Sequence, residues 1–229
     1  MDTETGKAIQ CVGFIMDGNR RWAQERGLDT LEGHRAGYES FVSLVEVLRG
    51  RSVSHAVFYA FSTENWGRTE REVSYLMELF ETTLVKLLAE VHERGVAVKI
   101  VGDTSRFSEK LQALMAELEE KSAEYAGTTI WLALSYGGRP EIISAVNRAM
   151  AEGGMVTEDS FEKLLWTAGM PDPDLIIRTG GEQRLSNFLP WQSVYSELFF
   201  VDTYWPDFNE EEFQGILEVY GTRHRRKGI

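Results

Sequence analysis

Six short, continuous apolar runs alternate with longer helical patterns along this 229-residue chain. Continuous apolar runs are typical of strands buried on both faces of a sheet, and strands separated by helices indicate a parallel sheet covered by helices. The predicted strands lie at 11–16, 55–61, 96–101, 129–135, 175–178 and 198–202, and the predicted helices at 34–50, 69–94, 104–125, 139–152, 157–168 and 209–225. The sequence therefore predicts an α/β fold with a central, mostly parallel six-stranded sheet flanked by helices.

Composition limits the domain organisation and the partners. The length favours a single domain over 1–229, with a flexible N-terminus at 1–10 and a basic C-terminal tail at 221–229. A formal net charge of -12 disfavours nucleic acid as a partner, because polyanion binding normally requires a basic face. The single cysteine, the absence of a signal-peptide pattern and the absence of a transmembrane segment predict a cytoplasmic protein.

The stretch from Phe14 to Trp22 predicts a phosphate site. An apolar strand delivers Asp17 to its carboxyl end, Gly18 permits a sharp turn, and a helix starts near Asn19. Helix-start amides and two following arginines would hold a phosphate, but Asp17 would repel it unless a cation lies between them. The pattern thus favours a Mg²⁺–pyrophosphate site. An ordinary strand–helix turn with an N-cap aspartate is the alternative.

Polar and glycine-rich segments follow five of the predicted strands. In open parallel sheets ligands bind outside the carboxyl ends of the strands, so these segments are expected to meet at one edge. The segments begin at Asp17, Ser62, Gly102, Ser135 and Arg178. The last of them is the most ligand-like, because two arginines and a serine bracket a glycine pair, although a solvated turn with an Arg–Glu salt bridge remains possible.

The apolar residues of the predicted 69–94 helix spread too widely for a narrow core stripe. Core packing explains such a face, but a groove between this helix and the preceding one could instead hold a long apolar ligand. The histidines lack metal-ligand spacing, and His34 at a predicted helix start could contact a phosphate. Nucleophile-elbow and P-loop motifs are absent, which leaves acyl transfer and P-loop chemistry without support.

Nine segments in order resemble the cis-prenyltransferases, whose bacterial type is undecaprenyl diphosphate synthase, also called isoprenyl transferase. The resemblance runs from about Cys11 to the C-terminus. Its motifs are Met16-Asp17-Gly18-Asn19-x-Arg21-Trp22, Gly33-His34-x-Ala36-Gly37, Tyr59-Ala60-Phe61-Ser62-Thr63-Glu64-Asn65-Trp66, Gly102-Asp103, Tyr136-Gly137-Gly138-Arg139, the segment from Arg178 through Ser186 to Phe188, Trp191-Gln192, Tyr195-x-Glu197-Leu198 and Trp205-Pro206-Asp207-Phe208.

The resemblance implies a homodimeric, Mg²⁺-dependent transferase that condenses isopentenyl diphosphate with an allylic diphosphate such as farnesyl or geranyl diphosphate. The product would be a Z-polyprenyl diphosphate, a lipid-carrier precursor. The growing chain would occupy a hydrophobic tunnel between sheet and helices, and peripheral membrane association would serve product release.

The resemblance also assigns roles to residues. Asp17 and Glu197 are implied as the metal-linked acids, and Asn65 as the catalytic residue tied to proton removal. The residues implied in substrate binding are Gly18, Asn19, Arg20, Arg21, Trp22 and His34 for the allylic pyrophosphate, Ser62, Thr63, Glu64, Trp66 and Arg68 in the following loop, Arg178, Arg184, Leu185 and Ser186 for isopentenyl diphosphate, and Arg226 for the partner's site.

Several positions depart from the family pattern. Arg20 replaces a common glycine, and Thr30 stands where a primer-binding arginine is expected, so Arg20 could compensate. Gln183 replaces a histidine found in some members. Trp131 is bulky enough to form the floor of the tunnel, or could simply pack against an outer helix. The helix over 72–93 carries no obvious insertion, which favours a medium-to-long product.

Two other functions compete with an active transferase. A catalytically silent partner subunit of the same fold would lose the first aspartate motif, which is intact here. A phosphohydrolase with an aspartate nucleophile would need a second acid two residues after Asp17, where Asn19 stands.

Overall fold

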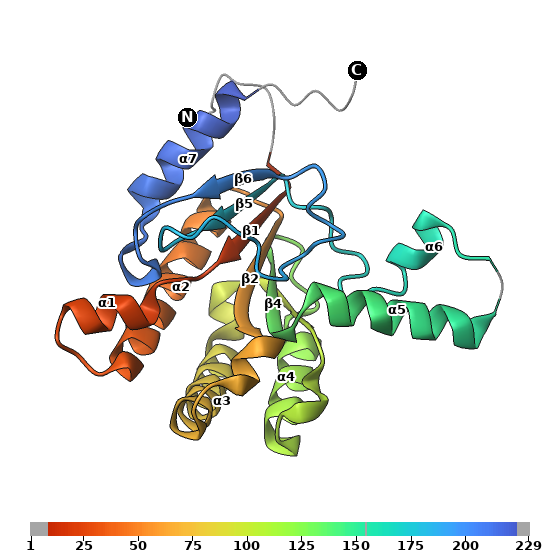
Figure 1. The fold of residues 1–229 in the computed structure, drawn as a ribbon, viewed down its shortest axis with the longest axis horizontal. Coiled ribbons are helices and arrows are strands. Elements are labelled where there is room, and N and C mark those ends of the chain that lie inside the picture. Colours follow the sequence, from red (N-terminus) through yellow and green to blue (C-terminus); the bar gives the residue numbers. More distant parts are fainter. Residues whose placement is uncertain (1–8, 154, 224–229) are drawn as a thin grey trace.

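The computed structural model describes residues 9–153 and 155–223. Within them six strands form one sheet in the order β3-β4-β2-β1-β5-β6, and every neighbouring pair is parallel (Figure 1). The strands are β1 (Cys11–Ile15), β2 (His55–Ser62), β3 (Ala97–Val101), β4 (Thr129–Tyr136), β5 (Leu175–Arg178) and β6 (Glu197–Phe200). The predicted α/β fold is confirmed, and the sheet is wholly rather than mostly parallel.

The connections are helices and short 3₁₀ turns. The helices are α1 (Asn19–Glu25), α2 (Thr30–Gly50), α3 (Glu70–Arg94), α4 (Glu109–Ser122), α5 (Gly138–Glu152), α6 (Glu158–Glu162) and α7 (Glu210–Thr222), and the turns are η1 (Thr63–Gly67), η2 (Thr104–Arg106) and η3 (Trp205–Asp207).

The N-termini of two helices differ from the predicted ones because a side chain caps each helix at another residue. The Asp29 side chain accepts a hydrogen bond from the Leu31 amide, so α2 begins at Thr30, and Ser108 caps α4 in the same way after the separate turn η2. The helix predicted over 157–168 ends at Glu162.

The two faces of the sheet carry different cores. The larger core joins the sheet to α2, α3, α4 and α7, and includes Ile130, Leu132 and Leu134 of β4. The smaller core lies on the opposite face beneath the segment around residues 170–189, and includes Trp131 and Ala133. Because side chains alternate along a strand, β4 divides its residues between the two cores.

The strand register shows which residues lie at the carboxyl end of the sheet and which lie at the amino end. Ile15, at the carboxyl end of β1, pairs with Tyr59 in β2 and with Arg178, the last residue of β5. Glu197, the first residue of β6, pairs with Leu175, the first residue of β5. Among the described residues no helix combines the length and apolar character that a bilayer crossing requires.

Candidate active site

The carboxylate of Asp17 lies at the carboxyl end of the sheet between two arginines. Arg178 Nη2 is 2.8 Å from Asp17 Oδ2, and Arg21 Nη2 is 3.2 Å from Asp17 Oδ1. Gly18 has a φ of 107°, which a residue with a Cβ rarely adopts, and its amide donates to Asp17 Oδ1 at 2.7 Å. Asp17 is thus held among arginine side chains by the end of β1, the turn at Gly18 and the start of α1.

A polar cavity of about 350 Å³ opens beside Asp17. Three arginines and one histidine line it, and Asp17 is its only acid among the described residues. Its lining consists of Met16, Asp17, Gly18, Asn19, Arg20, Arg21, Gln24, His34 and Arg68. The structure therefore brings seven of the predicted site residues together at one cavity with an excess of positive charge.

Glu72 on α3 is the shared partner of two arginines and a histidine around this cavity. Its carboxylate lies 2.8 Å from Arg68 Nη1, 3.3 Å from His34 Nε2 and 3.8 Å from Arg20 Nη1. Burial, and then the nearby Arg68 charge, lowers the pKa of His34 below its usual value, although Glu72 acts against that shift. His34 is therefore neutral near pH 7 and can donate or accept one hydrogen bond.

Two glycines bring α2 close to α1. A Cβ atom added at Gly33 would lie 2.0 Å from the Asn19 carbonyl oxygen, and one added at Gly37 would lie 2.3 Å from Asn19 Oδ1. Because these residues are four apart, they lie on one face of α2. The glycine motif is thus explained by helix packing, and it fixes His34 next to the polar cavity.

A second cluster follows β5. The Arg178 side chain is only 5% exposed, and its Nη1 donates to Ser186 Oγ at 2.7 Å and to the Arg184 carbonyl. Ser186 and Asn187 have positive φ values of 49° and 67°, an uncommon backbone for such residues. Arg184 is exposed and pairs with Glu182, while Leu185 packs against the smaller core. Arg178 therefore joins the two predicted anion sites.

The η1 turn connects to the second cluster. Ser62 Oγ accepts from the Asn65 amide and Asn65 Oδ1 accepts from the Ser62 amide, which makes a capping box. Glu64 accepts from Asn187 Nδ2 at 3.0 Å, and Thr63 donates to Glu64 at 3.1 Å. Trp66 Nε1 donates to Ser135 Oγ at 2.9 Å. The turn is thus held between β4 and the segment after β5.

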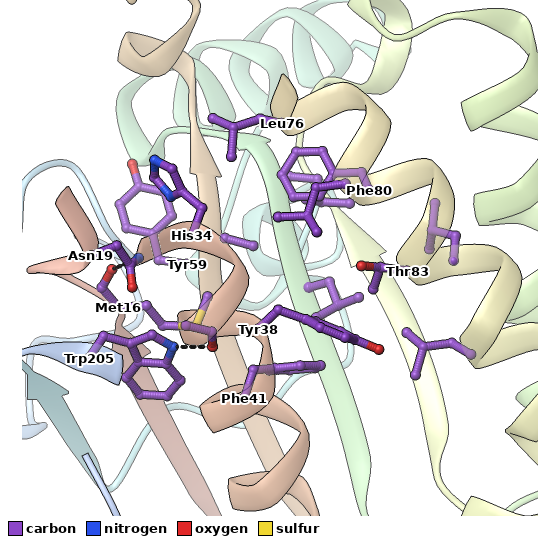
Figure 2. Close-up of a pocket in the computed structure, with 17 residues that line it drawn as sticks. Met16, Asn19, His34, Tyr38, Phe41, Tyr59, Leu76, Phe80, Thr83 and Trp205 are labelled. Carbon is purple, nitrogen blue, oxygen red and sulfur yellow. Dashed lines mark hydrogen bonds between the residues drawn. The ribbon is translucent and has the colours of Figure 1, made fainter. Parts of the chain in front are cut away.

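An apolar cavity adjoins the polar one. Met16, Asn19 and His34 line both, and the apolar cavity continues between α2, α3 and the sheet (Figure 2). Its volume is about 120 Å³, and aliphatic and aromatic side chains such as Phe41, Leu76 and Phe80 dominate its wall. The alternative of a groove for an apolar ligand is therefore supported alongside core packing for the α2 and α3 faces.

Some predicted residues lie elsewhere. Trp22 is absent from the lining of both cavities, and its Nε1 donates to Asp207 at 2.7 Å. Glu197 pairs with Arg223 at 2.7 Å at the amino end of β6, so the chain does not bring it to Asp17 at the carboxyl end of the sheet. Arg226 lies outside the described residues.

The hypothesis that Trp131 forms the tunnel floor is wrong. Leu132 and Leu134 line the apolar cavity, whereas Trp131 belongs to the core on the other face of the sheet. Its Nε1 donates to His55 Nδ1 at 3.1 Å. The period of two along β4 places adjacent residues on opposite faces, so the indole cannot meet the cavity.

Three residues of the site were not predicted from the sequence. Glu72 carries a weak signal, its four-residue spacing from Arg68, which lies just before α3. Tyr38 follows His34 by one turn of α2, so it lies on the same face. Thr83 has no signal of its own among the apolar residues of α3.

A parallel sheet whose carboxyl edge joins a cationic pocket to an apolar one defines a protein that handles an anion attached to a hydrocarbon. The prenyltransferase family model whose description names undecaprenyl diphosphate synthase matches residues 15–228. The chain belongs to this family, as the sequence motifs predicted, and its class is that of a cis-prenyltransferase.

Individual relatives agree with the family match. An isoprenyl transferase of Agrobacterium fabrum is 44% identical over 236 residues, covering 100% of this chain and 96% of the relative. A farnesyl-diphosphate-specific ditrans,polycis-undecaprenyl-diphosphate synthase of Micrococcus luteus is 42% identical, with 95% and 90% covered. The crystal structure of lavandulyl diphosphate synthase from Lavandula x intermedia with dimethylallyl diphosphate has a TM-score of 0.92 at 33% identity, covering 96% and 98%.

Proposed function

We propose that this chain condenses isopentenyl diphosphate with an allylic diphosphate, such as farnesyl or geranyl diphosphate, to give a Z-polyprenyl diphosphate that serves as a lipid-carrier precursor. The observation that carries the proposal is the junction of the two cavities at Met16, Asn19 and His34. A prenyl diphosphate has a charged head and an apolar tail, and the junction offers each of them a matching environment.

The polar cavity would bind the allylic diphosphate. The Arg20, Arg21 and Arg68 guanidinium groups supply forked donors, and the start of α1 directs backbone amides toward the same space. Charge develops on the diphosphate as the allylic C–O bond breaks, so preorganised cations lower the barrier to that step. Arg20 in this lining supports the interpretation that it compensates for Thr30, which begins α2.

Mg²⁺ would be held by Asp17 together with diphosphate oxygens. The residues fit this mode, because Mg²⁺ commonly uses one or two carboxylates plus substrate phosphates, and Asp17 is the single acid among the described residues that line the polar cavity. No group of three or more His, Cys, Asp or Glu side chains suited to a metal occurs in the described part of the chain. When bound, the ion would neutralise charge on the departing pyrophosphate.

The cluster after β5 would bind isopentenyl diphosphate. Arg178 is oriented by Ser186 and Asp17, and Arg184 and Leu185 lie on the same segment. Asn65 would lie near the proton lost from this substrate. Its neutral amide can orient a hydrogen-bonded group but does not take a proton itself. Ser62, Thr63, Glu64 and Trp66 would fix the position of Asn65 through the bonds of η1.

A homodimer completes the proposal. Glu197 could serve a metal-linked role only in a site shared with another chain, because in its own chain it lies at the opposite end of the sheet from Asp17. We place the protein in the cytoplasm, since its one cysteine, Cys11, is buried and free. Peripheral contact with a membrane would remove the product.

Incubation with labelled isopentenyl diphosphate and several primers, with Mg²⁺ or EDTA, tests the proposed function. We expect extraction of labelled prenyl diphosphates into organic solvent only when primer and Mg²⁺ are both present. Release of inorganic phosphate without a condensed product would indicate a phosphohydrolase. A folded protein without turnover would indicate a catalytically silent partner subunit.

A further inference from the structure

Tyr38 crosses the apolar cavity partway along its length. Its ring extends from α2 toward α3, where Thr83 lines the same cavity (Figure 2). The Tyr38 hydroxyl is buried and has no hydrogen-bond partner in the part of the chain that the structure describes. A ring in this position obstructs a hydrocarbon tail that enters from the His34 end.

A small second cavity adjoins the apolar cavity. Phe41, Leu87 and Leu132 line both, and the second has a volume of only about 20 Å³, with Arg94 in its wall. Arg94 forms ion pairs with Glu90 of its own helix at 2.5 Å and with Glu46 at 3.3 Å, and the second pair joins the C-terminal halves of α2 and α3. Apart from Arg94 the second cavity is lined by apolar side chains, but at about 20 Å³ it adds little space for a hydrocarbon chain.

The volume limits the length of chain that can be enclosed. An apolar protein cavity of about 150 Å³ holds one benzene molecule, whose size is close to that of an isoprene unit. The 120 Å³ cavity thus encloses on the order of one such unit before a side chain must be displaced. Tyr38 is the largest side chain that projects from α2 into this space.

We propose that Tyr38 is the specificity-determining residue for product length, and that its ring limits how far the hydrocarbon chain can grow. The inference rests on the proposed function. Growth continues as long as each added unit finds apolar space, so the first rigid ring across the path sets the length.

The test compares product lengths by chromatography after dephosphorylation, using isopentenyl diphosphate and farnesyl diphosphate with the full chain. Tyr38→Ala should shift the distribution toward longer chains by at least one isoprene unit. Tyr38→Phe should leave it unchanged, because the ring and not the hydroxyl forms the obstruction. Tyr125→Ala is the matched control, since Tyr125 contacts His92 outside the cavity and should not alter product length.

Two further variants cover the case in which Tyr38→Ala fails to fold. Tyr38→Leu keeps apolar bulk but removes the rigid ring and should lengthen the product, whereas Thr83→Phe fills the opposite wall and should shorten it. An active, folded Tyr38→Ala or Tyr38→Leu enzyme with the wild-type distribution overturns the inference. A wild-type protein that makes no condensed product overturns the proposed function instead.

Discussion

The ion pair between Asp17 and Arg178 should contribute to the free energy of unfolding, and this contribution can be measured separately from catalysis. Arg178 is 4% exposed, so Asp17→Ala leaves a buried guanidinium without its carboxylate, while Ser186 and the Arg184 carbonyl still accept hydrogen bonds from it. Unit charges 4 Å apart interact by about 4 kcal/mol at an effective dielectric constant of 20. The Asp17 side chain is 30% exposed, and solvent screening reduces the expected loss to about 1–3 kcal/mol.

Unfolding of Asp17→Ala, Arg178→Met and the double variant, followed by circular dichroism in urea, measures this energy as a cycle. We expect a coupling of about 1–3 kcal/mol, and a melting temperature for Asp17→Ala lower by about 2–4 °C per kcal/mol lost. Arg178→Met should cost more than Asp17→Ala because Ser186 also loses a partner. Additive single changes, with a coupling below about 0.5 kcal/mol, would refute the reasoning.

Asp17→Asn tests the catalytic role of the Asp17 charge separately from its contribution to stability. The amide oxygen can still accept from Arg178, so we expect its stability to lie between those of wild type and Asp17→Ala. Its turnover should nevertheless fall by about 10²–10³ or more, because the negative charge that would hold Mg²⁺ is lost. Wild-type turnover by Asp17→Asn would show that the charge of Asp17 has no catalytic role.

Three further changes test other parts of the site. Arg184→Ala should raise the KM for isopentenyl diphosphate about tenfold and that for the primer much less. Equal effects on both KM values would show that Arg184 does not belong to the isopentenyl diphosphate site. The lowered pKa of His34 means that the unfolded chain gains this proton at a higher pH than the folded protein does. Urea titrations should therefore show stability falling as the pH drops below 6.5 in wild type, and falling less in His34→Gln. Trp131→Ala should cost about 3–5 kcal/mol of stability and leave product length unchanged. A longer product on chromatography would contradict this expectation.

The sheet and its functional edge could be predicted because both follow from local sequence. Continuous apolar runs define parallel strands, and parallel strands place the residues after Ile15, Ser62 and Arg178 at one edge. The nature of the Asp17 environment could not be predicted in this way. The residues next to Asp17 in the sequence show only an acid at a strand end, whereas the fold brings Arg178 to it across adjacent strands.

Residues in long helices and at strand starts were harder to place. Glu72 lies within α3 among other charged residues, and only tertiary structure shows that it faces Arg20 and His34 rather than solvent. Glu197 lies in a family motif, but its distance from the site depends on the direction and register of β6. The choice between Trp131 and Tyr38 as the obstruction depended on strand phase and helix orientation, which apolar patterns leave undetermined.

The close approach of α2 to α1 at Gly33 and Gly37 allows the size of the apolar cavity to evolve independently of diphosphate binding. Any side chain at either glycine would push α2 away from Asn19 and disturb recognition of the charged head. Tyr38 and Phe41 project into the apolar cavity and can change in size without moving the α1–α2 contact. Related enzymes can therefore inherit one way of binding diphosphates while each lineage adjusts the hydrocarbon it builds.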